Sequence, residues 1–135
     1  QRCFIEGDFW YEWAGHIEGI SRAHLNILSH GPCYREDGTW YPKGSFREDF
    51  QITGSFEGHV LGRYGSFEYV EIVTFTPVPG GQVPEWPDYD LEGRIILQHG
   101  TGELAGLHGV LTEEGSSRDG VEEGGYEGRI HIDPK

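Results

Sequence analysis

The feature that most constrains the fold of this chain is a short pattern in which an apolar residue is followed by Glu and then by Gly. In an extended strand alternate side chains share a face, so the apolar residue and the Gly point one way and the Glu points the other. An inward-facing Gly lets a strand coil sharply or lets a neighbouring backbone come close. The pattern therefore predicts a curved sheet, and it occurs five times, at Ile5-Glu6-Gly7, Ile17-Glu18-Gly19, Phe56-Glu57-Gly58, Leu91-Glu92-Gly93 and Tyr126-Glu127-Gly128.

Stretches of alternating apolar and polar residues, separated by turn residues such as Asp37-Gly38, Gly80-Gly81 and Asp119-Gly120, indicate strands rather than helices. The 135 residues are about the length of one domain. The prediction is a single all-β domain over 1–135, a small closed antiparallel β-barrel of about eight strands. The expected strands are Cys3–Trp10, Glu18–Ser29, Phe46–Thr53, Phe56–Leu61, Gly65–Thr76, Tyr89–Gln98, Leu107–Thr112 and Gly125–Ile132.

Charge and composition limit the partners. The net charge is −13 and the 10 Lys and Arg residues are scattered, which argues against nucleic acid and against anionic membranes. No apolar run approaches the roughly 20 residues of a membrane helix, so we expect a soluble chain. It begins at Gln1 and contains no Met, so we expect translation to start upstream. Localisation, cytoplasmic or secreted, stays open, because Cys3 and Cys33 can pair in an oxidising compartment or remain free thiols. The oligomeric state also stays open, with a homo-oligomer as one alternative.

Two motifs in the second half of the chain carry a resemblance to a known family. The strand start Gly62-Arg63-Tyr64-Gly65-Ser66-Phe67 is followed later by Ile96-Leu97-Gln98-His99 and Gly100-Thr101-Gly102-Glu103-Leu104-Ala105-Gly106-Leu107-His108-Gly109. Together they resemble an uncharacterised, mainly bacterial family of allene-oxide-cyclase-like β-barrel proteins. The second half matches well and Gly15–Asn26 matches loosely, whereas Pro77–Pro87 looks like an insertion and the loop Gly31–Lys43 has no clear counterpart.

This resemblance implies a barrel that holds an apolar substrate in its lumen, because the wider superfamily includes cyclases and proteins that steer reactive organic intermediates. It implies no role for any single residue. The glycines of the Gly100–Gly109 motif are best explained by tight turns and close strand crossing. A phosphate-binding loop is a poor alternative, since the motif contains no Lys or Arg and no helix follows it.

The strand Glu18–Ser29 offers the first candidate site. Arg22, His24 and Asn26 share one of its faces, and if that face lines the lumen they form a polar stripe inside an apolar cavity. His24 would then act as general acid or base, with Arg22 stabilising negative charge and Asn26 binding the ligand. The alternative is that this face is exposed to solvent, which is the norm for polar residues in antiparallel sheets.

The strand Gly65–Thr76 offers a second candidate. Phe67, Tyr69 and Glu71 share a face, and a carboxyl group among aromatic rings would have a raised pKa suited to proton transfer. The opposite face is equally mixed, and a bulge would change the assignment. We predict catalytic roles for Tyr69 and Glu71 and a ligand-binding role for Phe67, with solvation or pairing of Glu71 as the alternative.

Exposed aromatic clusters and histidines give weaker signals. Two aromatic clusters, Phe9-Trp10-Tyr11 with Trp13 and Trp40-Tyr41, are predicted to line the mouth of a cavity, with Trp10 and Trp40 as the ligand-binding residues. Core packing is one alternative, and a sugar-binding platform of aromatic rings flanked by acids is another. The seven histidines show no local metal-ligand spacing, so no metal and no cofactor are predicted. The acids of 113–119 are expected in a solvated turn.

The sequence thus favours a cofactor-free cyclase or isomerase acting on an apolar small molecule held in a barrel. In such an enzyme shape and orientation supply most of the catalysis. The first alternative is a non-catalytic barrel in which the same residues only bind a small molecule. The second is a structural module whose lumen is filled by side chains.

Overall fold

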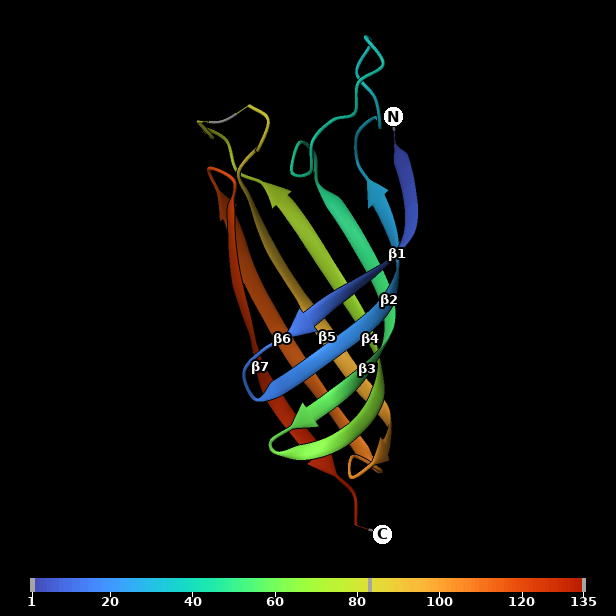
Figure 1. Cartoon of the computed structure of the whole chain (residues 1–135). Helices are drawn as coiled ribbons and strands as arrows, with labels where there is room; N and C mark the ends of the chain where they lie inside the picture. The colour runs from blue at the N-terminus through green and yellow to red at the C-terminus, as the bar shows by residue number, and fades with distance from the viewer. Residues whose placement is uncertain (1, 83, 135) are drawn as a thin grey trace.

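The structure of the chain is a computed structural model that describes residues 2–82 and 84–134 (Figure 1). Seven antiparallel strands follow one another as a meander, each hydrogen-bonded to the next along the chain. The described residues contain no helix, which confirms the all-β prediction. The described part of the chain accordingly offers no long apolar helix that could cross a membrane. The strands are β1 (Cys3–Trp13), β2 (Ile17–Ser29), β3 (Glu48–Val60), β4 (Arg63–Pro77), β5 (Tyr89–Gly102), β6 (Leu107–Arg118) and β7 (Val121–Ile132).

The strand count differs from the prediction because the expected strands Phe46–Thr53 and Phe56–Leu61 form one strand, β3. Gly54 and Ser55, which suggest a turn in the sequence, instead continue the ladder. Gly54 pairs with Ala23 on β2 and Tyr69 on β4. Because β3 has a partner on both sides, its backbone stays extended through two residues of low strand propensity.

The sheet is strongly curled, but the predicted closure of the barrel is not confirmed. No ladder joins β1 to β7 among the residues that the structure describes. The β1–β2 hairpin nevertheless crosses towards β7 (Figure 1). There the Tyr126 hydroxyl accepts a hydrogen bond from the Ile17 N–H at 3.2 Å and donates one to the Ala14 carbonyl at 2.7 Å. We call this boundary between β7 and the β1–β2 hairpin the seam.

Inward-facing glycines explain the tight curl. Gly19, Gly58, Gly65 and Gly102 stand opposite one another on β2 to β5 and form a row across the sheet. A Cβ atom on any of the first three would lie 2.2 or 2.3 Å from a carbonyl oxygen of a neighbouring strand. Any side chain larger than hydrogen would therefore push the strands apart. The prediction that these glycines allow close approach is confirmed here, although a Cβ on Gly7 would meet nothing within 4 Å.

The inner face of the curled sheet is an aromatic core. The Trp13 ring packs edge-on against three rings, those of Phe56, Phe67 and Tyr69, at centroid distances of 5.5 to 6.1 Å. Phe67 and Tyr69 are each only 1% exposed. The face of Gly65–Thr76 that carries Phe67, Tyr69 and Glu71 is therefore the inner one, and the one irregularity of β4 against β5 lies at Ser66 and Glu68.

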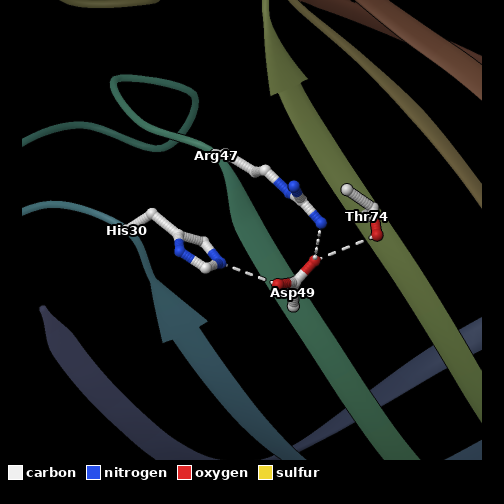
Figure 2. A network of polar contacts seen from close by, with 4 residues as sticks. All are labelled: His30, Arg47, Asp49 and Thr74. Atoms are coloured by element: carbon white, nitrogen blue, oxygen red, sulfur yellow. Dashed lines mark hydrogen bonds and ion pairs between the residues drawn. The ribbon is translucent and has the colours of Figure 1, made fainter.

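A disulfide and a group of polar contacts stabilise the end of the sheet that lies near the N-terminus. A disulfide joins Cys3 at the start of β1 to Cys33 in the β2–β3 connection. On the outer face, Asp49 of β3 contacts His30, Arg47 and Thr74 (Figure 2). The His30 bond is the shortest at 2.7 Å, and it is the main reason that the pKa of Asp49 is lowered. These contacts tie β2, β3 and β4 together where the connecting loops begin.

Candidate functional site

Two glutamates face each other inside the curled sheet. Glu71 on β4 is 8% exposed, and Glu113 on β6 is half-buried. Both point inward because their strands alternate, with Tyr69 and Val73 flanking Glu71 on its face and Leu111 on the face of Glu113. The β5 partner of Glu113 is Gly93, so no β5 side chain stands at that register position.

The surroundings of Glu113 favour its neutral form. Burial, followed by a hydrogen bond with Glu71 and repulsion by its charge, raises the pKa of Glu113 to about 9. The Oε1 atom of Glu113 is buried and accepts no hydrogen bond. Both facts agree if Glu113 is a neutral carboxylic acid that donates to the Glu71 carboxylate, because two adjacent buried carboxylates cannot both ionise cheaply. The site therefore holds a neutral acid, Glu113, beside the carboxyl group of Glu71.

Hydroxyl groups extend this pair into a directed chain of donors. The Tyr11 hydroxyl donates to Glu71 Oε1 at 3.1 Å, and the Tyr69 hydroxyl donates to Tyr11 at 2.5 Å. Ser21 hydrogen-bonds Tyr69 and accepts from Trp13 Nε1 at 2.6 Å. Burial and the Glu71 charge raise the pKa of Tyr11, so its proton stays in place. The Tyr69 and Tyr11 hydroxyl groups both donate in the direction of Glu71, which orients its carboxyl group.

This network lies at the wall of a pocket at the seam, which we call the seam pocket. Its volume is about 520 Å³. Tyr11, Trp13, Ile95 and Tyr126 provide aromatic and apolar walls, and Glu12 and His16 also belong to the lining. Among the residues that the structure describes, no Lys or Arg lines the pocket. A small molecule entering it would meet rings on its sides and the two carboxyl groups beyond them. Such a mixture of apolar walls and a few convergent polar groups is typical of ligand sites.

The residues predicted on Glu18–Ser29 lie elsewhere. Arg22, His24 and Asn26 point to the outer face of the sheet, as the solvent-facing alternative expects. His24 contacts Asp8 at 2.8 Å and Glu6 at 3.2 Å, and the Asp8 hydrogen bond is the main cause of its raised pKa. None of the three lines the seam pocket, so they are not brought together with Glu71. Arg22 and His24 line a depression on the outer face to which Tyr69 also contributes, whereas the Tyr69 side chain is buried in the inner core.

The aromatic residues that were predicted to contact a ligand lie in three different parts of the molecule. Phe67 lies in the inner core beside Tyr69, with ring centroids 6.1 Å apart. Trp10 is 63% exposed on the outer face. Trp40 lies in the β2–β3 connection, where its ring packs against Tyr34 at 4.5 Å. These three side chains therefore do not surround one cavity.

Glu113 is the member of the carboxyl pair that the sequence did not predict, whereas Tyr11 belongs to an aromatic cluster predicted at a cavity mouth and Tyr126 was predicted to face inward. Glu113 was expected in a solvated turn, and this is wrong because β6 continues to Arg118. Extending the expected strand by one residue past Thr112 places Glu113 on the face of Leu111, so the alternation contained the signal. The first expected strand also ended too early, at Trp10, whereas β1 continues to Trp13 and keeps Tyr11 on the inner face.

In the described ranges 2–82 and 84–134, no three His, Cys, Asp or Glu side chains converge as a metal site would require. Comparison of the chain with protein families, with curated proteins and with solved structures finds no match. The case for a function therefore rests on the geometry of the seam pocket.

Proposed function

We propose that this chain is a cofactor-free isomerase or cyclase that moves protons on a neutral, largely apolar small molecule bound in the seam pocket. The observation that carries the proposal is the meeting of Glu71 and Glu113 at the wall of the seam pocket, where burial and the hydrogen bond with Glu71 raise the pKa of Glu113. Two carboxyl groups with separated protonation states supply an acid and a base in the same site.

The roles follow from the hydrogen bonds. Glu113 donates its proton, or a strong hydrogen bond, to a carbonyl oxygen of the substrate. Glu71 takes a proton from the adjacent carbon. Glu71 then returns that proton to a different carbon while Glu113 recovers its own, so the product is an isomer and no other reactant is consumed. Tyr11 is a positioning residue that holds Glu71 in place through its 3.1 Å bond.

The lining of the pocket supports a neutral substrate. A carboxylate substrate would be repelled by Glu71 and would find no Lys or Arg in the lining. Apolar parts of a neutral ligand would pack against Trp13, Ile95 and Tyr126 and gain from their removal from water. Two finer expectations belong to this proposal: that the curled sheet acts as a closed barrel around its ligand, and that the chain is related to the allene-oxide-cyclase-like proteins.

The second candidate is a non-catalytic barrel in which the same residues bind a small molecule without changing it. The observation in its favour is that Glu71 already accepts hydrogen bonds from Tyr11 and Glu113, which weaken it as a base. Turnover distinguishes the two candidates, because both predict binding.

The test is proton exchange in heavy water. The protein is incubated with a panel of small β,γ-unsaturated and α-hydroxy ketones, and deuterium incorporation and isomerisation are followed by NMR. We expect exchange with the wild-type chain and at least a hundredfold slower exchange for Glu113→Gln and Glu71→Gln. Glu114→Gln is the matched control, because Glu114 is exposed on the same strand.

Equal rates in all variants would contradict the assignment of the carboxyl pair. Native mass spectrometry of the same mixtures reports binding separately. A ketone that is retained by the wild-type chain but neither exchanged nor isomerised would favour the binding barrel.

A further inference from the structure

The outer face of the sheet carries a continuous row of side chains across five strands. Trp10 stands opposite Arg22, Arg22 opposite Ser55, Ser55 opposite Glu68, and Glu68 opposite Gln98. Their strands alternate so that all five side chains point away from the core. Neighbouring strands are about 4.8 Å apart, so the row is about 19 Å long.

The surface along this row is hollowed. One depression of about 660 Å³ is lined by all five residues of the row. A second depression of about 810 Å³ shares Trp10, Arg22 and Ser55 with the first and continues to Tyr64. We call the two together the outer groove. It lies on the opposite side of the sheet from Glu71 and Glu113, and its lining contains neither residue.

The aromatic rings of the outer groove are presented to solvent. Trp10 is 63% exposed although the Arg22 guanidinium lies 4.2 Å from its ring centroid. Arg22 covers one face of the indole and limits its rotation, which leaves the remaining surface available for stacking. Tyr64 is 47% exposed, and its hydroxyl hydrogen-bonds Glu57. The outer groove therefore presents two aromatic rings, those of Trp10 and Tyr64, on which a flat apolar surface can stack.

The polar groups of the groove are of mixed type. Arg22 supplies only donors, Glu68 only acceptors, and Ser55 and Gln98 supply both. Sugars present the complementary pattern, because their rings have apolar faces and their edges carry hydroxyl groups that both donate and accept. A row with an indole at one end and hydroxyl, carboxylate and amide groups along its length thus matches a chain of sugar units.

From this geometry we propose that the outer groove binds a neutral oligosaccharide, with one sugar ring stacked on Trp10 and the following units lying along Ser55, Glu68 and Gln98. The ligand is neutral because the chain has a net charge of −13, which repels acidic polysaccharides. The row length of about 19 Å suits a short oligomer rather than a single sugar. This proposal goes beyond the proposed function and does not depend on it.

The experiment is a titration of the full chain with soluble cello-, xylo-, manno- and chito-tetraose. Binding is measured by isothermal titration calorimetry and by saturation-transfer NMR. We expect saturable binding of at least one of these tetrasaccharides. Trp10→Ala is expected to weaken that binding at least tenfold and Trp10→Phe to weaken it less, because the phenyl ring restores stacking. Glu68→Ala is expected to weaken it by a similar factor to Trp10→Ala without removing any ring.

Two controls make the outcome specific. Trp86→Ala removes a different indole that is 60% exposed in the β4–β5 connection, and it should leave binding unchanged. Glu113→Gln alters only the seam pocket and should also leave binding unchanged. Circular dichroism of each variant confirms that it is folded.

Three results would overturn the proposal. They are the absence of binding by all four tetrasaccharides, binding that survives both Trp10→Ala and Glu68→Ala, and binding that Glu113→Gln abolishes, which would place the sugar in the seam pocket. The first two leave the proton-exchange test of the seam pocket untouched.

Discussion

The Tyr126 hydroxyl accepts a hydrogen bond from the backbone N–H of Ile17 at 3.2 Å, although Ile17 begins β2 and Tyr126 lies on β7, the last strand of the sheet. One side chain of β7 thereby holds the β1–β2 hairpin at the place where a closed barrel would have a ladder. The same tyrosine ring lies 5.7 Å from the Trp13 ring and lines the seam pocket. The curl of the sheet and the shape of the candidate site therefore depend on the same residue.

Replacing Tyr126 with Phe should loosen the seam. The change removes the hydrogen bonds with Ile17 and Ala14 but keeps the ring, so we expect a loss of about 1–2 kcal/mol in the free energy of unfolding. Urea denaturation measures the loss, and hydrogen exchange of the Ile17 amide should become faster. Tyr64→Phe is the control, because that hydroxyl is bonded on the exposed outer face. Equal losses in the two variants would contradict a special role for the seam.

Gly54→Ala should disturb the hydrogen bonds of Tyr69 and Tyr11 by crowding the Tyr69 ring. A Cβ atom at Gly54 would lie 2.4 Å from Tyr69 Cζ and 2.5 Å from its hydroxyl oxygen. Because Tyr69 is fully packed, we expect a cost of about 1–3 kcal/mol and displacement of its hydroxyl from Tyr11.

The matched variant is Gly7→Ala, since a Cβ there meets nothing within 4 Å. It should be neutral or stabilise by up to about 1 kcal/mol, because alanine restricts the unfolded chain. Thermal unfolding of the two variants compares them directly. A destabilisation by Gly7→Ala as large as that by Gly54→Ala would show that crowding at Tyr69 is not the cause.

The disulfide between Cys3 and Cys33 closes a loop with a sequence separation of 30 residues. Restricting a loop of that length in the unfolded chain contributes about 3–4 kcal/mol to stability. The double variant Cys3→Ser with Cys33→Ser should therefore unfold at lower urea concentration, and mass spectrometry under non-reducing conditions should show the bridge in the wild-type chain. If reduction leaves the unfolding midpoint unchanged, the bridge does not hold the β2–β3 connection.

The sequence predicted the alternation well and the strand ends poorly. Inward glycines and the buried face with Phe67, Tyr69 and Glu71 follow from a period of two, which is a local property. The strand ends depend on pairing with neighbours, which is not local, and this is why β1 and β6 extend past their predicted ends. Glu113 was missed for this reason.

For Arg22, His24 and Asn26 the local pattern did not decide between the inner and the outer face of the sheet. The register of β2 against its neighbours then placed these side chains outside. The meeting of Glu71 with Glu113, across an intervening strand, is a property of the curled sheet and has no signature in the spacing of the two residues.

The raised pKa of Glu113 makes stability depend on pH in a definite direction. In the folded chain its pKa is about 9, against an ordinary value of 4.5 that we assign to the unfolded chain. Between these values the folded state binds the extra proton, so this group favours folding at low pH and its contribution is lost as the pH rises toward 9. In Glu113→Gln this dependence is absent.

The unfolding free energy of Glu113→Gln should therefore rise relative to wild type with increasing pH, by at most about 1.4 kcal/mol per pH unit. Urea denaturation at about pH 5, 7 and 8.5 measures the difference. Glu114→Gln should run parallel to wild type, because that side chain is exposed. Glu71→Gln should lower the pKa of Glu113 by removing the neighbouring charge, while burial still holds it above the ordinary value. Parallel curves for Glu113→Gln and wild type would mean that Glu113 is ionised in the folded chain, and the seam pocket would then lack its acid.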